Sequence, residues 1–248
     1  MMTFVAAQRI AKHFHLDLHT TYMRVTLTAI DVIGTLAELE IGEWLNLYDL
    51  LQGLMLPSGN DCANVIAENL GALLFFDKMG EKNMLNGLKS IDLSEDYSNI
   101  RLYTDTFVRY MNSIARELNM RSTLFSNPHG LSGREHYSSA EDMALLSAHL
   151  LNVSLVEQFI ECRSHEAKIK ISNNNQITIR SAVWENTNKL LEKPGFKGIK
   201  TGHTVNAGGC LSSYYINPLN GERLIIVVMG CKSQEARFSD TEATLELL

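Results

Sequence analysis

Lys200-Thr201-Gly202-His203-Thr204 and, far upstream, Ser58-Gly59-Asn60 are the two stretches that decide the fold of this chain. The first lies in a strand-like run, where lysine and glycine two residues apart share one face. Its glycine leaves the strand edge open to an approaching ligand. The second interrupts two helical patterns as a loop. Each tripeptide is common by itself, whereas the two together in this order indicate one polar site built from a loop and a strand.

These residue types suit acyl transfer to a serine. The hydroxyl of Ser58 can relay a proton, the amide of Asn60 can bind a carbonyl oxygen or an ammonium group, and Lys200 keeps the site electropositive. Acyl transfer also needs a nucleophile and a base, which enzymes of this kind take from a Ser-x-x-Lys turn. No Ser-x-x-Lys occurs in the 248 residues. The sequence therefore predicts Ser58, Asn60 and Lys200 as catalytic residues of a site that lacks its nucleophile and base.

Composition excludes several classes of partner. With 45% hydrophobic residues, 20% charged residues and a net charge of −6, the chain is an ordinary acidic globular protein. Nucleic-acid binders concentrate lysine and arginine on one face, so we expect no nucleic-acid partner. No stretch reaches the roughly 20 apolar residues of a membrane span, and no signal-peptide pattern opens the chain. We expect a monomer without a membrane segment.

Metal and cofactor binding are not predicted either. The eight histidines and four cysteines have no zinc-type spacing. Free buried thiols are favoured over a disulfide, which an exported protein could still form.

Periodicity predicts an α+β fold. Helices are expected over 4–14, 47–56, 63–74, 103–118, 140–151 and 233–248, with Asn60 or Asp61 capping the third. Strands are expected over 21–27, 166–171, 176–180, 198–204, 209–216 and 224–230, with a loop over 38–44. We expect one domain, 1–248, in which helices flank an antiparallel sheet. An all-helical lobe (about 45–155) would be inserted into a sheet lobe formed by 1–44 and 156–248.

Five stretches, in this order, carry a family resemblance. They are 50–61, Asn127-Pro128-His129-Gly130-Leu131, 137–144, 186–191 and 198–204. Together they resemble the D-alanyl-D-alanine carboxypeptidase family of low-molecular-weight penicillin-binding proteins, within the serine β-lactamase-like superfamily. The resemblance covers nearly the whole chain.

The resemblance implies a β-lactamase/transpeptidase-like fold with the site in a cleft between two lobes. It implies removal of the terminal D-alanine from peptidoglycan stem peptides through an acyl-serine, capture of β-lactams by the same serine, and an extracytoplasmic location. Thr201, Gly202 and His203 would bind the substrate, with the main-chain N–H of His203 as one oxyanion donor. Histidines 129 and 136 would brace a structural loop.

Three departures from the family pattern qualify these expectations. In the family, the sequence resembling Met1-Met2-Thr3 directly follows the motif lysine, so the nucleophile would lie upstream of residue 1. We therefore expect an N-terminally truncated chain that is inactive as written. Residues 75–102 have no good counterpart, and a variable surface loop is favoured there over a partner site. The chain ends at Leu248 without the β-rich second domain and membrane anchor that many members carry.

Two alternatives stay open. A pseudoenzyme could use the same residues to hold a D-Ala-D-Ala peptide without cleaving it. A β-lactamase ranks lower, because such enzymes usually have Ser-Asp-Asn in place of Ser58-Gly59-Asn60 and many need a glutamate loop that is not found here.

Overall fold

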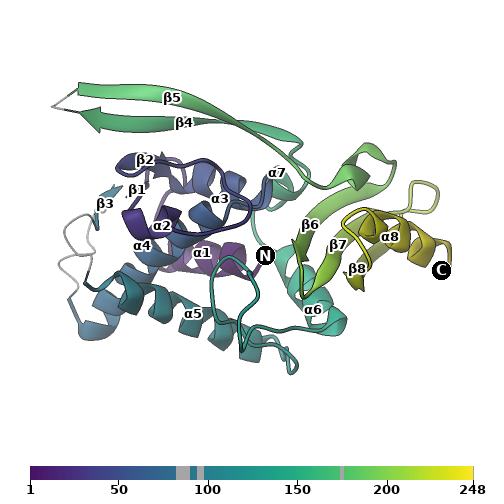
Figure 1. Cartoon of the computed structure of the whole chain (residues 1–248). Helices are drawn as coiled ribbons and strands as arrows, with labels where there is room; N and C mark the ends of the chain where they lie inside the picture. Colours follow the sequence, from purple (N-terminus) through teal and green to yellow (C-terminus); the bar gives the residue numbers. More distant parts are fainter. Residues whose placement is uncertain (82–89, 94–97, 174–175, 248) are drawn as a thin grey trace.

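Helices form the middle of the molecule and strands form its two sheets, as the computed structural model shows (Figure 1). The structure describes residues 1–81, 90–93, 98–173 and 176–247. The helices are α1 (Met2–His13), α2 (Leu27–Ile30), α3 (Leu47–Met55), α4 (Asn60–Met79), α5 (Ile100–Glu117), α6 (Ala140–Leu150), α7 (Glu157–Ile160), the 3-10 helix η2 (Lys189–Glu192) and α8 (Ala236–Glu246). The strands are β1 (Tyr22–Arg24), β2 (Glu43–Asn46), β3 (Ser90–Ile91), β4 (Ser164–Asn173), β5 (Gln176–Glu185), β6 (Phe196–Thr204), β7 (Gly208–Ile216) and β8 (Arg223–Cys231).

The core forms around α1 and α4. Phe4, Val5 and Ile10 of α1 are fully buried, so this helix packs on several sides at once. Helix α4 lies against α1 and α5, and Gly71 makes the second contact possible. A Cβ at Gly71 would lie only 2.1 Å from the carbonyl oxygen of Tyr103. The two long helices therefore approach at backbone distance.

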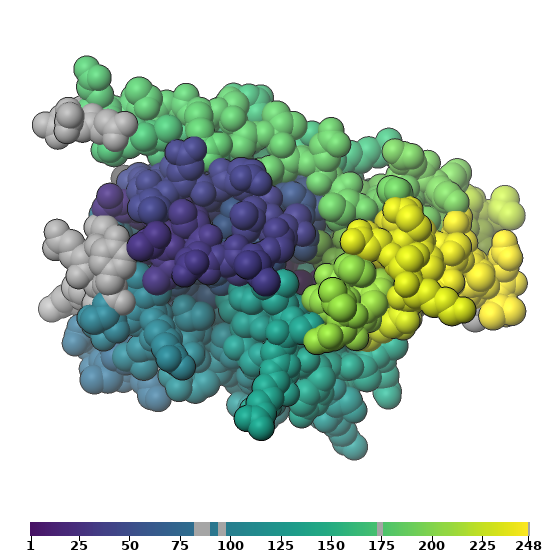
Figure 2. All heavy atoms as spheres, in the orientation of Figure 1, coloured from purple at the N-terminus to yellow at the C-terminus, as the bar shows by residue number. Residues whose placement is uncertain are grey.

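The strands form two sheets. One has five strands in the order β3-β1-β2-β4-β5, and the other has three in the order β6-β7-β8. All pairs are antiparallel except β1–β3, which is parallel. The α+β class is confirmed, but the expected single sheet is two sheets, because the long β4–β5 hairpin runs along α3 while β6 to β8 lie at the far end beside α8 (Figures 1 and 2).

Several predicted boundaries were wrong. The predicted loop over 38–44 contains the start of β2 at Glu43, because this strand pairs with β1 and β4. Helix α4 begins at Asn60, three residues early, and its cap is Gly59. Asp61 does not cap α4, because its carboxylate accepts the main-chain N–H groups of Ala37 and Leu39 at 2.9–3.2 Å.

The segment 75–102 lies partly outside the described residues, since 82–89 and 94–97 are not described. Its first part continues α4 to Met79, and its last part starts α5. The predicted final helix is shorter and spans Ala236–Glu246, with residue 248 outside the described part. The division into two lobes stays a prediction, and α1, which that division gives to the sheet lobe, packs against α4 and α5.

All four cysteines are free thiols, two of them buried and two half-buried. Across the ranges that the structure describes, no helix combines the length and the apolar character that crossing a bilayer requires.

Candidate active site

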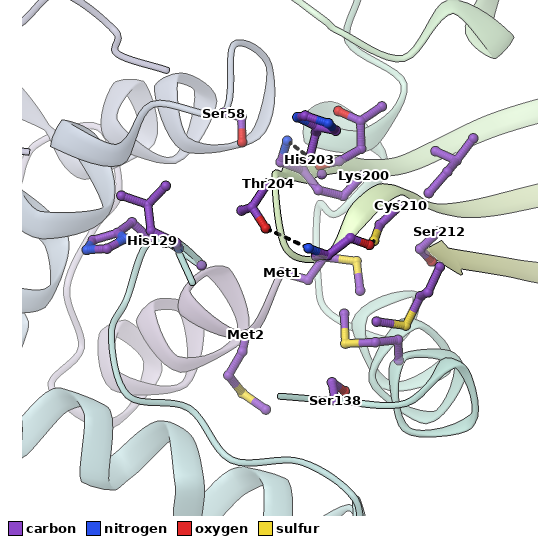
Figure 3. Close-up of a pocket in the computed structure, with 18 of the residues that line it drawn as sticks. Met1, Met2, Ser58, His129, Ser138, Lys200, His203, Thr204, Cys210 and Ser212 are labelled. Carbon is purple, nitrogen blue, oxygen red and sulfur yellow. Dashed lines mark hydrogen bonds between the residues drawn. The ribbon is translucent and has the colours of Figure 1, made fainter. Parts of the chain in front are cut away.

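A hollow of about 560 Å³ opens between the first turn of α1, the loop before α4, the loop over 127–138 and the sheet β6-β7-β8. Figure 3 shows Ser58 and His129 on one side of it and Lys200, His203 and Cys210 on the other, with Met1 and Met2 between them. All six residues predicted for the site line this hollow: Ser58, Asn60, Lys200, Thr201, Gly202 and His203. The tertiary fold thus brings the two motifs together.

Ser58 sits in a strained turn. Its φ of +67° is in the left-handed region, which non-glycine residues rarely adopt. The next residue, Gly59, donates its N–H to the carbonyl of Gly53 at 2.9 Å, and a Cβ on Gly59 would meet that same oxygen at 3.0 Å. Within the described chain, the Ser58 hydroxyl has no hydrogen-bond partner. The turn therefore presents a free hydroxyl at the hollow.

Asn60 is tied to the neighbouring wall. Its side-chain Nδ2 donates to the carbonyl of Ile33 at 2.7 Å, and its main-chain N–H donates to the carbonyl of Thr35 at 2.8 Å. The amide is therefore held in one orientation, with one of its two side-chain hydrogens used on Ile33. Only its second hydrogen and its oxygen remain for a ligand.

Lys200 carries a perturbed ammonium group. Burial, and then the nearby positive charge of Arg237, lower the pKa of Lys200 from 10.5 to about 7. Its Nζ donates to the carbonyl of Thr201 at 3.1 Å. At neutral pH, both the charged and the neutral amine are therefore populated.

Arg237 is the main site residue that sequence reasoning missed. It comes from α8, is only 6% exposed, and donates from Nη1 to the carbonyl of Gly202 at 3.1 Å. Its Nε has no hydrogen-bond partner among the residues that the structure describes. The available signal was its spacing of four from Thr241 and of eight from Leu245, which places an arginine on the buried side of a helix.

The wall of the hollow beside Lys200 and Arg237 carries no acid, and the acid that acts on Arg237, Glu235, lies outside the described lining. None of the described residues that line the hollow is aspartate or glutamate, although the chain as a whole is acidic. Two basic groups therefore face a hollow that holds no counter-charge. An anionic group of a ligand would supply it.

Gly202 and His203 complete the strand side. A Cβ at Gly202 would meet nothing nearer than the Cβ of Cys210 at 3.9 Å, so the glycine is not required by the packing of the chain itself. The open strand edge therefore stays available to a ligand backbone. The ring of His203 is exposed, with its Nδ1 3.3 Å from Nε2 of Gln234.

The two loop histidines brace main chain, as predicted. Nδ1 of His129 accepts the N–H of Leu131 at 3.2 Å, and Nδ1 of His136 accepts the N–H of Ser126 at 3.1 Å. Burial, with His136 close by, lowers the pKa of His129 to about 4. Both roles require the neutral ring, because an acceptor nitrogen carries no proton.

No nucleophile–base pair is present among the described residues of the hollow. Its serines are Ser58, Ser138 and Ser212, and none of them hydrogen-bonds to a lysine. Ser212 instead contacts the hydroxyl of Ser147 at 2.7 Å. The described lining therefore combines basic groups and an open strand edge with serines that are not paired to a lysine.

Comparison of the fold with solved structures defines its class. The crystal structure of the Streptomyces K15 DD-transpeptidase matches with a TM-score of 0.80 and 23% identity, over 99% of this chain and 85% of that one. The D-alanyl-D-alanine carboxypeptidase DacD from Francisella tularensis matches with a TM-score of 0.74 and 22% identity, over 99% and 62%. The chain has the fold of these DD-peptidases.

Sequence comparison then gives the family. A family model described as D-alanyl-D-alanine carboxypeptidase, Peptidase_S11, matches residues 101–233, more than half of the chain. This chain belongs to that family of serine peptidases.

The carboxypeptidase DacF of Bacillus subtilis is 28% identical over 226 residues, which are 90% of this chain and 48% of that protein. DacA of Haemophilus influenzae is 28% identical over 84% of this chain and 43% of its own. The chain thus spans about half the length of these curated relatives.

Proposed function

We propose that the hollow binds the C-terminal D-alanyl-D-alanine of a peptidoglycan stem peptide. The observation that carries this proposal is the pair Lys200 and Arg237 in a hollow whose described lining includes no acid. A terminal carboxylate would place a negative charge between them and accept from the unpaired Nε of Arg237. The same recognition suits the carboxylate of a β-lactam.

The rest of the site would orient the peptide. The open edge at Gly202 admits an extended backbone, the remaining amide hydrogen of Asn60 can donate to a carbonyl oxygen, and the N–H of His203 can stabilise an oxyanion. Thr201 lines the same strand. These roles agree with the names of the relatives as D-alanyl-D-alanine carboxypeptidases.

Hydrolysis would need a serine oxygen that attacks the penultimate carbonyl carbon. The C–N bond then breaks, D-alanine leaves with a proton on its nitrogen, and water releases the acyl group from the serine. We propose that this serine and its base come from a Ser-x-x-Lys turn outside the 248 residues, on the N-terminal side of Met1. The 248 residues alone would then bind but not acylate.

Labelling with a fluorescent penicillin tests whether the 248 residues bind the peptide while an upstream segment supplies the nucleophile. We compare the 248-residue chain with a form extended by the codons upstream of Met1. Covalent labelling of the extended form alone would support a carboxypeptidase whose nucleophile that segment supplies. If neither form is labelled while both bind peptide, the pseudoenzyme alternative is supported, because Asn60, Lys200 and Arg237 suffice for binding.

Peptide affinity tests recognition separately. The chain should bind a fluorescent stem peptide ending in D-Ala-D-Ala, and Arg237→Gln should weaken binding about tenfold through loss of one charge-assisted contact. The matched control is the same peptide with a C-terminal amide, whose binding Arg237→Gln should leave unchanged. Equal binding of acid and amide by the parent chain would refute carboxylate recognition.

A further inference from the structure

A single side chain, that of Thr187, connects the two motifs of the site. Its Oγ1 lies 2.6 Å from Oγ1 of Thr201, the residue next to Lys200. The same Oγ1 donates to the carbonyl of Leu56 at 3.4 Å, and the N–H of Thr187 donates to that carbonyl at 3.2 Å. Leu56 is two residues before Ser58, so the hydroxyl of Thr187, at the wall of the hollow, links the strand to the chain that leads into the Ser58 turn.

One arrangement of the two hydroxyl hydrogens satisfies both contacts of Thr187. Each threonine has one hydroxyl proton, and the proton of Thr187 is directed to Leu56. In this arrangement Thr201 donates to Thr187 across the 2.6 Å contact, in which either oxygen can be the donor. The result is a chain of donors from β6, through Thr187, to the main chain that precedes the Ser58 turn.

We propose that Thr187 is a positioning residue that sets the spacing between the Ser58 turn and the strand carrying Lys200, and thereby the width of the peptide site. This inference rests on the proposed function for its ligand. Nothing in the motif chemistry requires it, since Thr187 comes from the segment between β5 and η2. The side chain is exposed and lines the hollow, so removing its hydroxyl opens no internal cavity.

Two substitutions separate the hydroxyl from the shape of the side chain. Thr187→Val keeps the shape and loses the hydroxyl, whereas Thr187→Ser keeps the hydroxyl and loses a methyl group. Thr178→Val, at an exposed position of β5, is the matched control. All three chains should fold with a thermal midpoint close to that of the parent.

The first readout is affinity for the fluorescent D-Ala-D-Ala peptide. We expect Thr187→Val to weaken binding about fivefold, the effect of one lost hydrogen bond, and Thr187→Ser and Thr178→Val to bind like the parent. In a Thr201→Val background, Thr187→Val should have little further effect, because the connection between the strand and the loop is already broken at Thr201, and the hydroxyl contact with Leu56 alone cannot restore it.

The second readout needs no ligand. Loosening the connection should admit water to Lys200 and raise its pKa from about 7 toward 10.5, as followed by NMR of the ε-carbon of lysine. Parental affinity and a parental Lys200 titration in Thr187→Val would overturn the proposal, as would a Thr187→Ser chain as impaired as Thr187→Val. If even the parent fails to bind peptide, the proposed function fails, and the Lys200 titration alone decides the role of Thr187.

Discussion

At the scale of single residues, Lys200 is the group whose chemistry the fold changes most. A free lysine side chain is charged throughout the physiological range, but here burial and the charge of Arg237 lower the pKa to about 7. The lowered value means that the charged form is disfavoured in the folded chain. A ligand carboxylate between the two basic groups would reverse this and raise the pKa of Lys200 again.

The pKa of Lys200 makes stability depend on pH. Between about pH 7 and 10.5 the unfolded chain holds the Lys200 proton more strongly than the folded chain does, so the free energy of unfolding should rise with pH across this window. Below pH 7 both states are protonated, so this group no longer changes the free energy of unfolding with pH. The α-amino group of Met1, with its pKa lowered from 8.0 to about 5 by burial, also contributes a rise up to about pH 8. Urea unfolding at several pH values should therefore show a steeper rise between pH 7 and 10.5 in the parent than in Lys200→Met; equal slopes for the two chains would contradict it.

At the scale of elements, the β4–β5 hairpin supports the N-terminus of α4 through the segment 37–39. Nε1 of Trp184 donates to the carbonyl of Ala37 at 3.0 Å, and Nη2 of Arg180 donates to the carbonyl of Glu38 at 2.8 Å. The carboxylate of Asp61 holds the N–H groups of Ala37 and Leu39 from the other side. The hairpin is thus connected to the turn that carries Ser58.

Arg180 also neutralises a buried acid. It pairs with Glu43, whose side chain is only 3% exposed, through Nε and through Nη2 at 2.7 Å. Arg180→Met should lower the free energy of unfolding by about 3 kcal/mol, because it leaves that carboxylate without a counter-charge.

The double variant Glu43→Gln/Arg180→Met is the control for that substitution. Its glutamine oxygen can still accept the N–H of Glu40, which Glu43 accepts at 2.8 Å, so the double variant should regain much of the loss. Chemical denaturation measures both chains, and a double variant as unstable as Arg180→Met would show that the charge is not the cause.

At the scale of the whole molecule, the hollow is closed by contacts between segments far apart in the sequence. The hydroxyl of Thr204, which lines the hollow, lies 2.9 Å from that of Ser132, and the hydroxyl of Thr3 in α1 donates to the carbonyl of Pro128. A ligand in the hollow therefore touches helices, loop and sheet together. Its binding should stabilise the chain as a unit.

Ligand linkage gives this expectation a magnitude. At a stem-peptide concentration of about 100 times its Kd, the free energy of unfolding should rise by about 2.7 kcal/mol. Arg237→Gln at the same peptide concentration should show a smaller rise. A peptide that binds without any shift in the urea midpoint would mean that the unfolded chain binds it equally well.

Size-exclusion chromatography of the same samples tests the predicted monomer.

The sequence by itself determined two things: the elements whose residues follow a regular helical or strand spacing, and the two motifs of the site. Helical spacing identified most of the long helices, and Lys200-Thr201-Gly202 with Ser58-Gly59-Asn60 indicated the site, because these signals lie within short stretches of chain. The start of β2 was predicted wrongly because it depends on pairing with a distant strand. The start of α4 was predicted wrongly because the carboxylate of Asp61 binds the main chain of Ala37 and Leu39 instead of capping the helix.

Only the tertiary structure decided which other groups reach the site. Arg237 arrives from the last helix, and Thr187 comes from the stretch 186–191, which carries the family resemblance but gives no sign by itself that its threonine contacts Thr201. The lowered pKa of Lys200 likewise depends on burial and on the approach of Arg237. Spacing along the chain encodes local conformation, whereas proximity between residues far apart, and the field they create, arise only when the chain folds.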